Sequence, residues 1–151
     1  MYKFSNSIFI PSKLENVFSV FSELRFLCVI WDYIINIELI TEGKINEGSK
    51  IKFIMLNDSN KIKNTAEVIE FLPNKALGII SKKAGTEVIY RYSFVEKNGG
   101  TEIQYLEEVN FENYQQDLAE QIFEIIKEED YTQLEKIRDY FYGFDNNVIN
   151  G

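Results

Sequence analysis

The sequence predicts an α+β fold in which a curved antiparallel sheet of about seven strands wraps around a long C-terminal helix. Strand patterns follow one another from about Ile34 to Val109, and helical patterns occur only near the two ends of the chain. Neighbouring antiparallel strands form one sheet, and the closing helix is the segment available to cover its apolar face. The length of 151 residues suits one domain with a substantial core.

The chain is predicted to open with a strand and two short helices. Apolar residues alternate over residues 2–10, with Asn6 as a polar exception, which indicates the first strand. Ser12 and Glu15 have the spacing of a capping box, so we expect the first helix to begin there and to run to about Ser22. A second short helix or an irregular turn is expected over about 23–32.

Six further strands are predicted, separated by turn signals. They cover about 35–40, 51–55, 61–72, 76–82, 88–94 and 101–109. In the first of these, Ile35, Ile37 and Leu39 are expected to share one face. The Asn98-Gly99-Gly100 run before the last strand is typical of a hairpin turn.

The remainder of the chain is predicted to be helical. Apolar residues recur at spacings of three and four, which indicates one long helix or two helices with a bend within 127–132. We expect an apolar stripe to cover the sheet, made by Ile122, Ile125, Ile126 and Leu134. We expect a solvated acidic face made by Glu124, Glu128, Glu129 and Asp130. One domain is expected over 1–143, with a frayed tail over 144–151.

Composition restricts the function. The net charge of −8 argues against nucleic acid as a partner, because phosphate contacts need clustered Lys and Arg. No apolar run reaches the roughly 18 residues of a membrane span and no signal peptide is evident, so we expect a cytoplasmic protein. The chain has no histidine, which removes the commonest general base and the favoured ligand of catalytic zinc and haem. We therefore expect no metal and no cofactor.

Three residues near the second predicted helix have side chains that could take part in chemistry. Cys28 is the only cysteine and has apolar neighbours, so we expect a buried side chain without a catalytic role. Trp31 is the only tryptophan and either lines a pocket entrance or anchors the short helix to the sheet. Asp32 is expected to be a local cap or turn residue.

The order of elements and several short motifs resemble the START-like, or helix-grip, superfamily. The first two motifs are Ile8–Ser12 followed by Val17-Phe18, and Trp31-Asp32 before the second predicted strand. The others are Gly48 before the third strand, a hairpin pattern made by Val68, Glu70, Pro73 and Leu77, and Gly99-Gly100-Thr101 in the last hairpin. The resemblance covers nearly the whole chain, which is most similar to small stand-alone bacterial members. It implies the helix-grip fold but not one function, since the superfamily includes lipid carriers, polyketide cyclases and dehydratases, and co-chaperone-like domains.

Aromatic residues of the last two strands predict a pocket. If Tyr90, Tyr92, Tyr105 and Glu107 face the helix, three hydroxyls and one carboxylate converge in a mostly apolar space. The alternative interpretation is that the aromatic rings fill the core and that Glu107 pairs with Arg91, a lysine or a tyrosine. The predicted ligand-binding residues are Trp31, Phe53, Tyr90, Tyr92, Tyr105, Glu107, Ile122, Phe123 and Ile126.

We expect a non-catalytic protein that binds a small apolar or aromatic molecule in a pocket of about 300 Å³ or more. No catalytic residue is assigned. Two alternatives stay open. One is an enzyme of the polyketide cyclase or dehydratase kind, with tyrosine hydroxyls and Glu107 as acid and base. The other is a co-chaperone-like interaction domain with an exposed apolar patch. The sequence leaves the ligand and the oligomeric state open.

Overall fold

The computed structural model describes residues 1–31, 33–83 and 85–150, and the expectation for Asp32 lies outside them. Side chains at positions 57, 83 and 144–150 are outside the description as well. The strands are β1 (Tyr2–Ile10), β2 (Ile34–Leu39), β3 (Lys50–Asn57), β4 (Asn60–Leu72), β5 (Ala76–Lys83), β6 (Thr86–Lys97) and β7 (Gly100–Phe111). The helices are α1 (Leu14–Ser22), α2 (Phe26–Ile30), α3 (Gln116–Asp130) and α4 (Gln133–Asn150).

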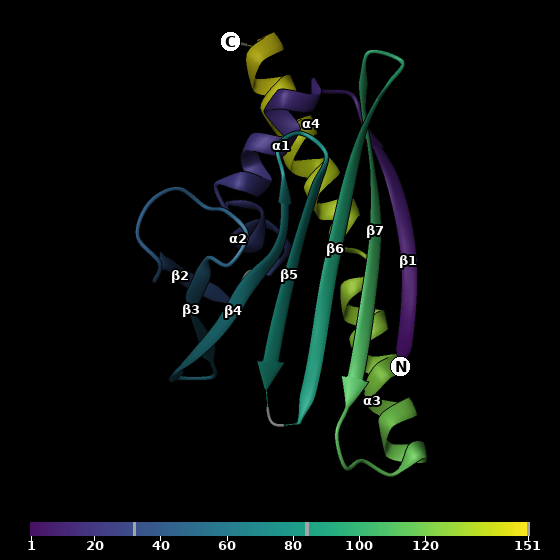
Figure 1. The fold of residues 1–151 in the computed structure, drawn as a ribbon. Coiled ribbons are helices and arrows are strands. Elements are labelled where there is room, and N and C mark those ends of the chain that lie inside the picture. Colours follow the sequence, from purple (N-terminus) through teal and green to yellow (C-terminus); the bar gives the residue numbers. More distant parts are fainter. Residues whose placement is uncertain (32, 84, 151) are drawn as a thin grey trace.

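The strands form one curved antiparallel sheet of seven in the order β1-β7-β6-β5-β4-β3-β2 (Figure 1). β1 pairs with β7 along its whole length, from Tyr2 opposite Val109 to Ile10 opposite Thr101. The helices lie on one side of this sheet, with α1, α2 and α4 gathered near one end and α3 toward the other (Figure 1). This arrangement confirms the predicted α+β helix-grip fold.

Turns and bulges set the register of the strands. Asn98 and Gly99 have positive φ angles of 51° and 79° and join Lys97 to its partner Gly100, as the hairpin signal predicts. A bulge in β2 between Ile34 and Asn36 corrects the expectation for Ile35. Ile34 is buried and Ile35 is exposed, the reverse of the expectation. The extra residue of the bulge shifts the alternation of inward and outward side chains by one position.

The first helix begins later than its capping signal predicts. Leu14 is its first residue, and the preceding Lys13 makes no side-chain capping bond. Ser12 instead belongs to the turn that ends β1, where its N–H donates to the Ile10 carbonyl at 2.8 Å. The predicted capping box is therefore wrong, because Ser12 lies one residue outside the N-cap position.

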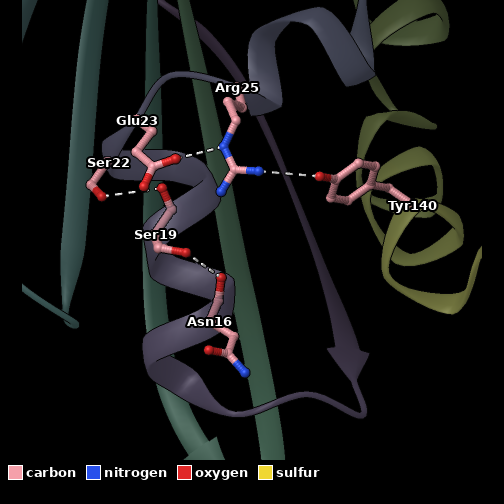
Figure 2. Close-up of polar contacts among 6 residues, drawn as sticks. All are labelled: Asn16, Ser19, Ser22, Glu23, Arg25 and Tyr140. Atoms are coloured by element: carbon pink, nitrogen blue, oxygen red, sulfur yellow. Dashed lines mark hydrogen bonds and ion pairs between the residues drawn. The ribbon is translucent and has the colours of Figure 1, made fainter. Parts of the chain in front are cut away.

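The turn between α1 and α2 is attached to α4 by a short polar chain (Figure 2). Arg25 Nε lies 2.6 Å from Glu23 Oε2, and Arg25 Nη1 donates to the Tyr140 hydroxyl at 3.4 Å. Leu24 has a positive φ of 62° in this turn and is buried. The five-residue α2 then buries Phe26, Leu27 and Ile30. Cys28 points the other way and is exposed, which corrects the expectation of a buried thiol.

The C-terminal segment consists of two helices that meet at Tyr131 and Thr132, within the predicted bend region. The residues of α3 that face the core differ from the expected ones. Ala119 and Phe123 face the core, whereas Ile125 is 57% exposed, and Ile122 is only partly buried. Phe123 packs against Tyr2 and Phe4 of β1, so α3 covers this edge of the sheet.

The backbone of α4 continues past Gly143 to Asn150, and a frayed tail over 144–151 stays a prediction. None of the helices that the structure describes has the length and apolar character that a membrane crossing needs.

Gly100 begins β7 in close contact with the end of β1. A Cβ atom there would lie 2.6 Å from the Ile10 carbonyl oxygen and 2.5 Å from Phe9 Cζ. We expect Gly100→Ala to lower the free energy of unfolding by about 1–3 kcal/mol, because backbone must shift to make room. Gly143→Ala is the control, since its Cβ would meet no atom within 4 Å and alanine favours a helix. Equal urea midpoints for the two variants would contradict this prediction.

Candidate functional site

The candidate site is built around the junction between α3 and α4, residues Asp130–Gln133, which side-chain hydrogen bonds hold in place. The Tyr92 hydroxyl of β6 donates to Gln133 Oε1 at 2.6 Å, and Gln133 Nε2 donates to the Asp130 carbonyl at 3.2 Å. Asn6 Nδ2 of β1 donates to the Tyr131 carbonyl at 3.1 Å. The polar exception in the first strand is therefore a contact to the end of α3, where carbonyl groups lack helical partners.

The second helix contacts the same junction. Trp31 Nε1 donates to Asp130 Oδ1 at 3.4 Å, and Lys136 Nζ of α4 donates to the Ile30 carbonyl at 3.1 Å. Trp31 is thereby fixed between the sheet and the helices. Its ring also meets the ring of Tyr90 edge-on, with centroids 5.4 Å apart at 71°.

Two buried carboxyl groups lie together beneath this junction. Glu107 is fully buried on β7 and accepts a hydrogen bond from the Tyr105 hydroxyl through Oε1, while Asp130 is 6% exposed. When both carboxyls are ionised, Glu107 Oε2 has no donor among the described residues. A proton on Glu107 supplies that donor and lets it hydrogen bond to Asp130. The two groups therefore form a carboxyl pair that is stable with Glu107 protonated.

Burial decides the protonation of this site. Loss of water, with Asp130 nearby, raises the pKa of Glu107 from 4.5 to about 10. Burial also raises the pKa of Asp130, although hydrogen bonds from Glu107 and Trp31 act against this effect. Burial raises the pKa of Tyr90, Tyr92 and Tyr105 well above 10 as well. The tyrosines are therefore neutral hydrogen-bond donors at physiological pH.

An inner cavity of about 70 Å³ lies between α2 and the concave face of the sheet. Aromatic and aliphatic side chains make most of its wall, and its polar groups come from Asn64, Ser81 and tyrosine hydroxyls. Its lining residues are Phe26, Leu27, Trp31, Tyr33, Ile34, Phe53, Met55, Asn64, Ile79, Ser81, Tyr90 and Tyr92.

An outer groove of about 320 Å³ lies beside the inner cavity, between the sheet and α3. Thr86, Val88, Tyr114 and Ile126 line it, together with the three residues that also line the inner cavity. These three residues, Asn64, Ser81 and Tyr90, lie on three adjacent strands and we call them the polar junction. These residues border both the cavity and the groove.

A larger hollow than either of these lies on the convex face of the sheet. It measures about 740 Å³ and is lined by small and polar side chains that include Ser5, Ser7, Ser93 and Gln104. Ligand sites for apolar molecules are enclosed and mostly apolar. The concave side therefore carries the candidate site, despite the larger volume on the convex side.

The structure brings together part of the predicted ligand-binding set. Trp31, Phe53, Tyr90 and Tyr92 line the inner cavity, and Ile126 lines the outer groove. The remaining four residues line neither space. Tyr105, Glu107 and Phe123 are buried in the core beside the cavity, and Ile122 is partly exposed on α3. Contact of any of these residues with a ligand stays a prediction.

The sequence predicts a single pocket of about 300 Å³ or more, but the enclosed cavity is smaller because two tyrosines pack inside it. Tyr92 and Tyr105 stack with ring centroids 4.8 Å apart and fill the centre of the concave side. The enclosed space is thereby reduced to about 70 Å³, and the larger volume lies in the open groove.

Sequence reasoning missed Asp130, Gln133 and the small residues of the polar junction. Asp130 was expected on a solvated acidic face, but it follows Ile126 by four residues and Phe123 by seven, so it shares their buried face. Ser81 follows the buried Ile79 by two residues, and Asn64 precedes the buried Ala66 by two. Helical and strand periodicity could have found these positions.

The comparisons with known proteins show the fold. No family model and no curated protein matches the chain. Among solved structures, Ara h 8.0201 has a TM-score of 0.74 at 13% identity and covers 94% of this chain and 98% of its own. A START superfamily protein from Mycobacterium smegmatis has a TM-score of 0.67 at 12% identity, covering 93% and 99%. The Zhui aromatase/cyclase from Streptomyces sp. R1128 has 0.73 at 9%, covering 93% of each. The chain therefore has the START-like fold.

The raised pKa of Glu107 predicts that stability depends on pH. Its contribution is fully present below the unfolded pKa of 4.5 and is lost as pH rises toward the folded pKa of about 10. The free energy of unfolding should therefore fall between about pH 5 and pH 9, by up to about 1.4 kcal/mol per pH unit from this carboxyl. Glu107→Gln should flatten the slope, because glutamine keeps a donor for Asp130 and an acceptor for Tyr105.

Urea unfolding followed by circular dichroism at several pH values measures this slope. Glu67→Gln removes an exposed carboxylate from β4 and serves as the control. A slope that is the same in Glu107→Gln as in the unmodified protein would disprove the assignment.

Proposed function

We propose that this protein binds a small, mainly apolar molecule on the concave side of the sheet, without chemical conversion. The observation that carries this proposal is that the inner cavity and the outer groove lie side by side and share the three residues of the polar junction. Apolar walls contribute binding free energy through burial, and a few polar groups fix orientation. The ligand would place a small group in the inner cavity and its larger part along the groove.

The polar junction has unused hydrogen-bonding capacity. Among the described residues, Tyr90 and Ser81 make no side-chain hydrogen bond, and Asn64 uses Oδ1 for the Thr65 N–H at 2.9 Å. Two hydroxyls and one amide can therefore meet a ligand hydroxyl, carbonyl or amine. Cross-strand register supports their convergence, because Ser81 lies opposite Val88 and Tyr90 opposite Ile79 on the same face.

The carboxyl pair favours a second candidate, an enzyme of the cyclase or dehydratase kind. A protonated Glu107 beside Asp130 and three tyrosines provides donors for acid–base chemistry. The fold is similar to that of the Zhui aromatase/cyclase, which adds only a fold-level analogy. Glu107 lines neither space, so its proton would have to reach a substrate through Tyr105 and then Tyr92, which lines the inner cavity. Turnover that persists in both Glu107→Gln and Asp130→Asn would exclude this candidate.

An interaction domain of the co-chaperone-like kind remains a third hypothesis. Leu118 is 49% exposed and Ile125 57%, and both lie on the outer side of α3 beside the partly buried Ile122. These exposed apolar side chains give this hypothesis a contact surface.

Neutral N-phenyl-1-naphthylamine, whose fluorescence rises in apolar surroundings, is a probe for the binding proposal. We expect it to bind, and we expect Ser81→Phe to weaken its affinity at least about tenfold, because the new ring fills the polar junction. Ser93→Phe adds the same ring on the convex face of the adjacent strand and should leave the affinity nearly unchanged. Fluorescence titration gives both dissociation constants, and native mass spectrometry of the purified protein would detect a bound molecule directly.

The proposal fails if neither the probe nor a smaller compound, such as hexanol or hexylammonium, binds. It fails equally if the two phenylalanine variants, both shown to be folded by circular dichroism, bind the probe as tightly as the unmodified protein.

A further inference from the structure

We propose that the inner cavity accepts the ammonium group of an organic cation, whose apolar remainder lies in the outer groove. The inference rests on the proposed binding function and names the ligand class of the same site. Three properties of the cavity support it: the aromatic wall, the buried carboxyls behind that wall, and the volume.

The wall of the inner cavity is rich in aromatic rings that attract cations. Its lining includes six of them, from Phe26, Trp31, Tyr33, Phe53, Tyr90 and Tyr92. The Trp31 and Tyr90 rings stand at 71° to each other, so they border the space from different directions. A cation within about 6 Å of such ring faces is attracted by their quadrupoles, and tryptophan attracts it most strongly. No lysine or arginine is among the described lining residues of the cavity.

The carboxyl pair lies behind two of these rings and, with Glu107 protonated, carries at most one negative charge, on Asp130. Trp31 Nε1 donates to Asp130 Oδ1 at 3.4 Å, and Tyr90 lies opposite Glu107 in the β6–β7 register. Neither carboxyl forms an ion pair among the described residues. Lys136 Nζ is bound to the Ile30 carbonyl at 3.1 Å, and Arg91 Nε lies 3.3 Å from Glu108 on the other face. Lys136 acts on Asp130 through space without forming an ion pair, and a bound ammonium would add positive charge near this carboxyl.

The two volumes fit a cation with a small head and a longer body. The inner cavity of about 70 Å³ has room for about two groups of the size of water, which occupies about 30 Å³. A primary or methylated ammonium is of that size. Ser81 Oγ and the second lone pair of Asn64 Oδ1 can accept its N–H groups. Val88, Tyr114 and Ile126 of the outer groove, about 320 Å³ in volume, can contact an alkyl or aryl body.

Hexylammonium, hexanol and hexanoate share one alkyl chain and differ in the charge of the head group, so they test the inference. Trp31 is the only tryptophan and lines the cavity, so its fluorescence reports binding of each compound. We expect hexylammonium to bind at least about tenfold more tightly than hexanol, and hexanoate to bind most weakly. Equal or tighter binding of hexanol would overturn the inference.

Asp130→Asn removes the charge and keeps an oxygen acceptor for Trp31. We expect it to reduce the preference of hexylammonium over hexanol to less than about threefold. Glu128→Gln removes one charge from an exposed position of the same helix and should leave the preference unchanged. An unchanged preference in Asp130→Asn would also overturn the inference. If that variant does not fold, the comparison of the three compounds on the unmodified protein still tests the inference.

The naphthylamine probe separates the two proposals. If this probe binds but hexylammonium has no advantage over hexanol, the ligand class is wrong and the binding function stands. If neither the probe nor hexanol nor hexylammonium binds, the binding function itself is wrong.

Discussion

The structure depends on the hydrogen bonds that hold the α3–α4 junction against the sheet and α2. β1 contributes Asn6, β6 contributes Tyr92, and α2 is joined through Trp31 and the Ile30 carbonyl. Because the junction interrupts the helix, its free carbonyls and the side chain of Gln133 become partners for these groups. The two C-terminal helices therefore have fixed directions, and the space between helix and sheet follows from them.

Glu107 and Asp130 make this interior more polar than its aromatic content suggests. A buried carboxyl without a cationic partner is costly unless it is protonated and hydrogen bonded, which is the state that burial imposes on Glu107. Replacement by apolar residues of similar volume is often neutral or stabilising in such places. The pair lies behind the wall of the aromatic cavity, which is why we include it in the candidate site.

Periodicity predicted the sheet and the helical ends well, because alternation and the spacing of three and four directly reflect which faces are buried. It failed where the buried face of a strand or helix is displaced by one residue. The bulge beside Ile34 moved Ile35 outward, and the offset of α3 placed Phe123 inside and Ile125 outside. The size of the cavity could not be predicted, because it depends on the stacking of Tyr92 on Tyr105. These residues lie on neighbouring strands, and periodicity does not indicate which rotamers they adopt.

The pairing of β1 with β7 has a consequence for how the chain folds. Tyr2 lies opposite Val109, and Asn6 contacts Tyr131, so the first strand has its partners near the other end of the sequence. Closing such long loops costs conformational entropy before the contacts are gained, and folds dominated by distant pairings fold slowly. During synthesis, β1 must therefore wait for most of the chain to leave the ribosome. Until then its apolar residues and open edge are available for incorrect association.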